Sequence, residues 1–203
     1  MLVIRDLVRR FKDRPVLDGV SLDVAAGEQV ALVGSNGAGK TTLLRCIAGT
    51  LTPQAGTITV GGHAAGTRQA ARQIGVSLSQ ERSFYQRLTG RQNLELFAAI
   101  HLGDRRLARR EVAEVVDELA LADIATRRLD RCSTGMTQQL ALARALVGAP
   151  SLVLLDEPTR SLDEEAVARM WEALSRREQL AVLIATHSPS DRARCDREVD
   201  PRA

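Results

Sequence analysis

The sequence predicts an α/β fold in which a buried parallel sheet is combined with an N-terminal antiparallel sheet and an inserted block of helices. Residues 151–156 (SLVLLD) and 180–186 (LAVLIAT) are continuous apolar runs separated by helical patterns, as in parallel strands covered on both faces. Residues 2–8 and 16–24 instead alternate apolar and polar side chains, which is typical of a half-exposed antiparallel sheet.

Further elements surround a glycine-rich loop in the first half of the chain. Residues 29–34 (QVALVG) predict a short apolar strand, and residues 40–49 predict a helix that ends at Gly49. A strand pair is expected around residues 56–62.

The block of helices is predicted from caps and apolar spacing. Thr89 begins one helix, and Gln92 three residues later completes a capping box. Residues 105–121 predict a second helix. We therefore expect a helical subdomain at roughly residues 81–147 within one domain that covers residues 1–203.

A third helix of this block begins within RCSTGM. Ser133 or Thr134 can act as its N-cap, and Gly148 supplies the stop. Two interpretations stay open at this point. The hydroxyl residues and Gly135 either only start the helix, or the unpaired amides there also face an anion such as phosphate.

Composition narrows the class of protein. The chain is 44% hydrophobic and 26% charged, as in ordinary globular proteins. Its net charge is +3, but basic and acidic residues are interleaved and aromatics make up 2%, so we expect no nucleic-acid partner. No apolar run has bilayer length and the first residues lack a signal-peptide pattern, so we expect a cytosolic chain. Cys46, Cys132 and Cys195 are odd in number and far apart, which favours reduced thiols.

The most specific motif is GSNGAGKTT, which matches GxxxxGK followed by Ser or Thr and stands between a predicted strand and a predicted helix. Glycines let backbone amides converge on phosphates, Lys40 neutralises the β and γ phosphates, and the Thr41 hydroxyl can coordinate Mg²⁺. The motif predicts a nucleoside triphosphate site. Its residues are Gly34, Ser35, Asn36, Gly37, Ala38, Gly39, Lys40, Thr41 and Thr42.

Two acids stand at the carboxyl end of a predicted buried strand, where α/β proteins bind ligands. Asp156 fits a metal contact through water, and Glu157 fits a general base, a role worth ~10²–10⁴ in rate. The alternative is a pair of acids that caps a helix, which a phosphate loop in the same chain makes the weaker interpretation. His187 follows the strand at 180–186 and can reach the γ phosphate, although a single histidine is more often structural.

Together these motifs resemble those of an ATP-binding cassette (ABC) ATPase, in that family's order and approximate spacing, from about Leu2 to His187. The resemblance implies an ABC-type P-loop NTPase fold with ATP and Mg²⁺ as ligands. The matching segments are residues 34–42, Gln80, the signature Ser133, Thr134, Gly135 and Met136, residues 152–159 (LVLLDEPT), Ser161, Leu162 and Asp163, and residues 185–187.

The resemblance also implies roles for single residues. Phe11 would stack on adenine, although a lone aromatic near a strand is as easily part of the core. Gln80 would join Thr41 and Asp156 at the metal and take part in catalysis with Glu157 and the switch histidine His187.

Residues outside the phosphate loop imply a second protomer. Asp163, with Ser161 and Leu162, would lie in a loop between protomers. The signature of one protomer would complete the nucleotide site of the other, so a homodimer or heterodimer of ATP-binding subunits is expected.

Thr134 stands where the family usually has glycine, and the resulting STGM resembles the signature of some efflux cassettes. The segment after Gln80 resembles the surface that meets a transmembrane subunit. We therefore expect an ATP-hydrolysing subunit of a membrane exporter, bound to a permease on the cytoplasmic face of the cell membrane. The alternatives are a soluble ABC ATPase and a nucleotide-binding module with impaired hydrolysis.

The last segment departs from this pattern. Residues 188–203 are polar, whereas the family continues through another strand pair. This shortened end is expected to leave an edge of the parallel sheet uncovered.

Overall fold

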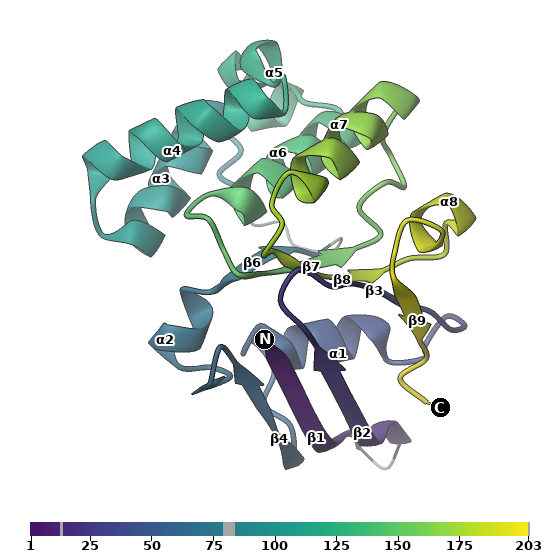
Figure 1. The fold of residues 1–203 in the computed structure, drawn as a ribbon. Coiled ribbons are helices and arrows are strands. Elements are labelled where there is room, and N and C mark those ends of the chain that lie inside the picture. The colour runs from purple at the N-terminus through teal and green to yellow at the C-terminus, as the bar shows by residue number, and fades with distance from the viewer. Residues whose placement is uncertain (13, 79–83, 203) are drawn as a thin grey trace.

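The computed structural model describes residues 1–12, 14–78 and 84–202, which form two sheets with helices around them (Figure 1). The first sheet is antiparallel, with the strand order β2-β1-β4-β5. This confirms the antiparallel sheet expected from the alternating N-terminal segments. Its strands are β1 (Leu2–Phe11), β2 (Arg14–Val24), β4 (Ala55–Val60) and β5 (His63–Ala64).

The second sheet is parallel, with the order β6-β7-β8-β3-β9. Its strands are β3 (Gln29–Leu32), β6 (Ile74–Ser77), β7 (Leu152–Asp156), β8 (Ala181–Ala185) and β9 (Arg197–Val199). Strands β7 and β8 are buried along their whole length, as their continuous apolar sequences predicted. The predicted α/β fold is therefore confirmed.

Side chains of β7 enter two separate cores. Val153 and Leu155 belong to the core under the helices, and Leu152 and Leu154 belong to the core shared with α1 (Lys40–Ile47) and the antiparallel sheet. Figure 1 shows the parallel sheet between these two layers. This packing fixes the carboxyl ends of β3, β7 and β8 beside one another.

The predicted caps of the helical block are largely present. The Thr89 hydroxyl accepts a hydrogen bond from Gln92 N at 3.2 Å, and Thr89 N donates to Gln92 Oε1 at 2.9 Å. The helix predicted over 105–121 ends earlier, at Glu118, because Ala120 adopts a left-handed conformation (φ 53°) and another helix follows. The helices of this block and of the rest of the chain are α2 (Arg68–Ala71), α3 (Gly90–Leu102), α4 (Arg105–Glu118), α5 (Ala122–Thr126), the 3₁₀ helix η1 (Leu129–Arg131), α6 (Thr134–Leu146), α7 (Glu164–Ser175) and α8 (Pro189–Arg192).

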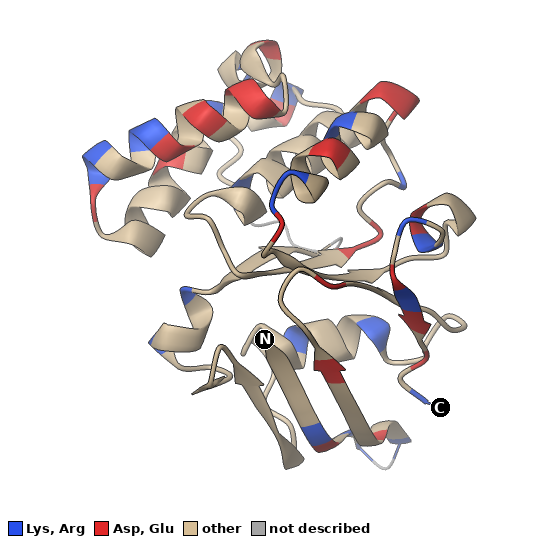
Figure 2. Ribbon diagram, in the orientation of Figure 1, with Lys and Arg blue, Asp and Glu red and all other residues tan. Residues whose placement is uncertain are grey.

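The expectation that the polar end leaves an edge of the parallel sheet uncovered does not hold at β3. Strand β9 pairs with β3 in parallel register, with Val30 opposite Arg197 and Leu32 opposite Val199. A polar strand can do this because the ladder uses backbone groups while its charged side chains pair at the surface. Arg197 contacts Glu28 at 2.6 Å. Figure 2 shows the alternation of basic and acidic residues along β9.

Membrane-spanning helices are absent from residues 1–12, 14–78 and 84–202: no helix there combines the length and the apolar character that a bilayer requires.

Candidate functional site

The glycine-rich loop brings the start of α1 to the carboxyl end of β3. Gly39 precedes α1 in a left-handed conformation (φ 93°), and no side chain caps this helix. A Cβ at Gly39 would lie 2.8 Å from the carbonyl oxygen of Val16, so only glycine fits there without displacement of β2. The uncapped amides of the first turn make this end of α1 suited to an anion.

The Lys40 ammonium is held against the loop by hydrogen bonds to backbone carbonyl groups. Its Nζ donates hydrogen bonds to the carbonyl oxygens of Gly34 at 2.7 Å and Ser35 at 3.3 Å. It also lies 3.3 Å from Nε2 of His187. A buried ammonium satisfied by loop carbonyls can exchange these partners for the oxygens of a phosphate.

Thr41 and Asp156 come together from α1 and β7. The Thr41 hydroxyl donates to Oδ2 of Asp156 at 2.9 Å, and Asp156 is nearly fully buried at the last position of its strand. A hydroxyl and a carboxylate are oxygen donors of the kind that Mg²⁺ prefers. In the described part of the chain no three His, Cys, Asp or Glu side chains are grouped to hold a metal. The residues present therefore fit a Mg²⁺ that takes its other ligands from phosphates and water.

Glu157 and His187 face one another across the ends of β7 and β8. Oε1 of Glu157 lies 3.7 Å from Nε2 of His187, and Oε2 accepts a hydrogen bond from the backbone N of His187 at 3.4 Å. Glu157 also has a positive φ of 49°, a strained conformation for a non-glycine residue that often marks a functional position. Neither acid caps a helix, because the N-cap of α7 is Asp163, so the capping interpretation is wrong.

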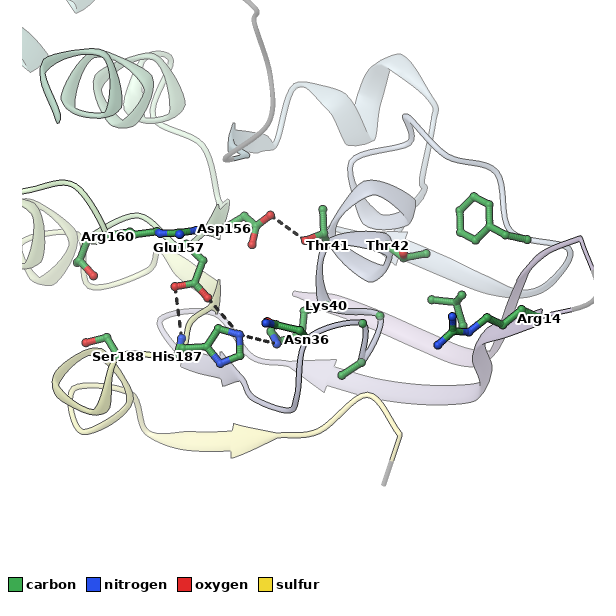
Figure 3. A pocket seen from close by; sticks show the side chains of 16 residues that line it. Arg14, Asn36, Lys40, Thr41, Thr42, Asp156, Glu157, Arg160, His187 and Ser188 are labelled. Atoms are coloured by element: carbon green, nitrogen blue, oxygen red, sulfur yellow. Dashed lines mark hydrogen bonds and ion pairs between the residues drawn. The ribbon is translucent and has the colours of Figure 1, made fainter. Parts of the chain in front are cut away.

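These side chains border one cavity of about 840 Å³, and small-molecule sites commonly have ~300–1,000 Å³. Figure 3 shows Lys40, Glu157 and His187 pointing toward one another and Thr41 facing Asp156. The structure thus brings together side chains that are separated by more than a hundred residues in the sequence. The lining residues are Phe11, Arg14, Val16, Asn36, Gly37, Ala38, Gly39, Lys40, Thr41, Thr42, Asp156, Glu157, Thr159, Arg160, His187 and Ser188.

Phe11 lies at the rim of the cavity rather than in the core. Its side chain is 46% exposed, and the Arg9 guanidinium lies 4.8 Å from the ring centroid. The alternative that Phe11 is a core residue is therefore wrong. Its ring is accessible to a flat ligand entering the cavity.

Several lining residues were missed by sequence reasoning. Arg14 and Arg160 add positive charge to the cavity, and Thr159 and Ser188 add hydroxyls. Each lies within three residues of a predicted site residue. A lone arginine beside a motif, however, reads in sequence as an ordinary surface charge.

Other predicted residues lie away from this cavity. None of Ser133, Thr134, Gly135 and Met136 lines it, nor do Ser161, Leu162 and Asp163. Ser133 is the N-cap of α6 and accepts a hydrogen bond from Met136 N at 3.2 Å. A Cβ at Gly135 would lie closer than 3.0 Å to the carbonyl oxygen of Ser161, so the signature packs on the 161–163 loop. Gln80 lies outside the described residues.

Comparison with known proteins assigns the family. A family model described as ABC transporter matches residues 17–160. The chain is 35% identical over 205 residues to the ABC transporter ATP-binding protein NatA of Bacillus subtilis (strain 168), covering 97% of this chain and 83% of NatA. It is 40% identical over 168 residues to the daunorubicin resistance ATP-binding protein DrrA3 of Streptomyces coeruleorubidus, covering 82% of this chain and 53% of DrrA3.

Similar relatives differ in length and in the direction of transport that their names give. They include Nod factor export and aliphatic sulfonate import ATP-binding proteins, and the chain spans 59% and 62% of the lengths of the two examples compared. A dimeric ATP-binding cassette in a post-hydrolysis state with ADP and Pi has the same fold, with a TM-score of 0.86 at 22% identity over 99% of this chain and 95% of that one. The matches in sequence and fold establish that this chain belongs to the ABC transporter family, as an ATP-binding subunit.

Proposed function

We propose that this chain binds Mg²⁺-ATP in the 840 Å³ cavity and hydrolyses it as the ATP-binding subunit of a membrane exporter. The observation that carries the proposal is a chain of contacts at one end of the parallel sheet. Nε2 of His187 lies 3.3 Å from Nζ of Lys40 and 3.7 Å from Oε1 of Glu157. A phosphate-binding loop and a paired carboxylate at one cavity are the elements that phosphoryl transfer to water requires. We propose that residues 1–203 form one such cassette.

The geometry suggests how each group acts. Lys40 and the amides at the start of α1 hold the phosphates, and the ring of Phe11 stacks on the base. Thr41, Asp156 and Gln80 would hold Mg²⁺, whose charge would offset that of the phosphates. The Glu157 carboxylate accepts a proton from the attacking water. His187, which contacts both Lys40 and Glu157, holds the carboxylate and the terminal phosphate in register.

A second protomer would complete this site. The signature at residues 133–136 lies outside the cavity, and the N-terminus of α6 can bind an anion beside the Ser133 cap. A structurally similar cassette is dimeric. Because the signature lies outside the cavity of its own chain, we infer a head-to-tail pair in which this end of α6 meets the partner's ATP.

Aromatic side chains offer a place for a permease subunit to dock. Tyr85 is 58% exposed and stacks on Phe97 with ring centroids 6.1 Å apart. Phe84 packs against the same ring in an edge-on arrangement, and the Arg144 guanidinium lies 4.6 Å from the Phe84 centroid. Phe84 and Tyr85 follow Gln80 closely in the sequence. We propose that the segment of Gln80 couples the site to the membrane partner on the cytoplasmic face. The direction, export, rests on the STGM signature.

Two alternatives are less well supported. A cassette with impaired hydrolysis would be expected to lack one of Lys40, Asp156, Glu157 or His187, yet all four border the cavity. A soluble ABC ATPase needs no permease. The exposed Tyr85, held beside Phe97, favours a partner instead.

Nucleotide binding to Lys40→Ala tests the first part of the proposal. We expect loss of measurable ATP binding by calorimetry, because the buried ammonium is removed, while Arg45→Ala, on the same helix, binds ATP as wild type does. ATP binding that survives Lys40→Ala would place the nucleotide elsewhere. The transporter role fails if the neighbouring gene encodes no multi-helix membrane protein and none co-purifies with the chain.

A further inference from the structure

Asp191 is a fully buried carboxylate that belongs to none of the recognised motifs. It lies in α8 and does not line the cavity. Its Oδ2 accepts hydrogen bonds from the hydroxyls of Thr159 and Thr186, at 2.5 and 3.1 Å. Its Oδ1 accepts from Nε1 of Trp171 in α7 at 3.1 Å. A carboxylate without access to water is tolerated because donors from several elements replace its hydration.

The partners of Asp191 are placed next to the reacting groups. Thr159 follows Glu157 by two residues, and Thr186 immediately precedes His187. The Thr186 hydroxyl, which donates to Asp191, also accepts a hydrogen bond from the backbone N of Ser188 at 3.0 Å. One carboxylate therefore ties the turn that follows Glu157 to the residue that precedes His187.

We propose that Asp191 is a positioning residue for hydrolysis, which sets the loop of Glu157 against the loop of His187. The inference rests on the proposed function, because it gives Asp191 a task only if these two side chains act on ATP. Asp191 touches neither the cavity nor a reacting atom, so it acts through Thr159 and Thr186. It should affect the rate of the chemical step more than the affinity for ATP.

Two variants remove the connection from different ends. Asp191→Asn keeps the shape but leaves one acceptor oxygen, and its amide group would face hydroxyl and indole donors. Thr186→Val keeps the side-chain volume and removes the hydroxyl, while Thr186→Ser keeps the hydroxyl and serves as the matched control. If either Asp191→Asn or Thr186→Val fails to fold, the other still tests the proposal.

The assay is steady-state ATP hydrolysis combined with NMR of the histidine rings without nucleotide. We expect Asp191→Asn and Thr186→Val to lower kcat by roughly 10- to 100-fold, as a small misplacement of catalytic groups does. KM for ATP should stay near the wild-type value, and Thr186→Ser should restore most of kcat. The ring resonance of His187, assigned with His187→Gln among the histidines at 63, 101 and 187, should move in Asp191→Asn and Thr186→Val but not in Thr186→Ser.

The outcomes separate the inference from the proposed function. Wild-type kcat and an unmoved His187 resonance in both variants would overturn the positioning role, and so would a raised KM at unchanged kcat. If the wild-type chain hydrolyses no ATP, the proposed function falls, and the His187 resonance alone then decides whether Asp191 positions that loop. The emission of Trp171, the single tryptophan, gives an internal check: it should change in Asp191→Asn, which alters its acceptor, and not in Thr186→Val.

Discussion

Gly135→Ala tests how the signature is joined to its own protomer. Gly135 lies in the first turn of α6 and needs no left-handed backbone, so alanine is conformationally allowed there. Alanine would add up to about 1 kcal/mol of helix propensity if space were open. The added Cβ would, however, lie closer than 3.0 Å to the carbonyl oxygen of Ser161. The two effects have opposite signs, so the sign of the measured change identifies the stronger one.

The overlap is large enough to reverse the propensity gain. A carbon atom normally approaches a carbonyl oxygen to about 3.3–3.6 Å, so the backbone at Ser161 or at α6 must shift by at least ~0.3 Å. Overpacking against a rigid neighbour costs about 1–3 kcal/mol. We expect Gly135→Ala to lower the free energy of unfolding by about 1–2 kcal/mol, which for a chain of this size lowers Tm by roughly 2–8 °C. A displaced signature should also lower ATP hydrolysis by roughly 10-fold.

The assay is denaturant unfolding followed by the fluorescence of Trp171, with phosphate release measured on the same samples. Thr134→Ala is the matched control for stability, because Thr134 is the exposed neighbour of Gly135 in the same turn. This control should leave the free energy of unfolding within about 0.5 kcal/mol of wild type. A Gly135→Ala protein as stable as wild type, or more stable, would refute the close contact between the signature and the 161–163 loop.

Three further predictions concern other parts of the chain. Glu118→Gln should lower the free energy of unfolding by about 1 kcal/mol, because it breaks a bidentate ion pair with Arg177 at 2.6 and 2.7 Å. The two side chains are about a fifth to a quarter exposed, and the loss should vanish in an Arg177→Ala background. Burial raises the pKa of Cys46 from 9.0 to about 11 and that of Cys195 to about 12, so at pH 8 the thiolate fraction of Cys46 is about 100-fold below that of a free thiol. Mass spectrometry after alkylation should therefore find both thiols unmodified until the protein unfolds or the pH rises toward these values. Phe11→Ala should weaken ATP binding by roughly 5- to 100-fold in calorimetry, as lost base stacking does, while kcat at saturation stays near wild type and Phe11→Tyr keeps the wild-type affinity. If Phe11→Ala bound ATP as tightly as wild type, the ring would not be part of the base site.

The fold was predictable where local patterns decide it. The apolar runs that form β7 and β8 are buried on both faces whatever their neighbours, so sequence alone identifies them. The loop at residues 34–42 was predictable because its glycines and Lys40 fall within nine consecutive positions between an apolar strand and a helix. Strand β9 was not predictable, because its polar side chains carry no strand signal and its pairing with β3 is set by the rest of the sheet.

The candidate site was predictable where motifs mark it and not where tertiary contacts make it. Sequence placed Asp156 and Glu157 at a strand end, but the left-handed backbone of Glu157 depends on its hydrogen bond to the carbonyl of Ala185 on the next strand. Arg160 lines the cavity only because the turn after β7 carries it there. Asp191 reads as one more acid in a polar tail, and its burial follows from the packing of α8 on Trp171.

Single-turnover hydrolysis by Glu157→Gln separates the proposed base from the groups that bind the nucleotide. The amide keeps the size of the side chain and loses the base that faces His187, so we expect phosphate release to fall at least ~100-fold while the amount of ATP bound stays equal to that of wild type. Glu164→Gln, which changes an acid in the first turn of α7 that does not line the cavity, is the matched control and should hydrolyse ATP at the wild-type rate. Undiminished phosphate release by Glu157→Gln would contradict the account of this site.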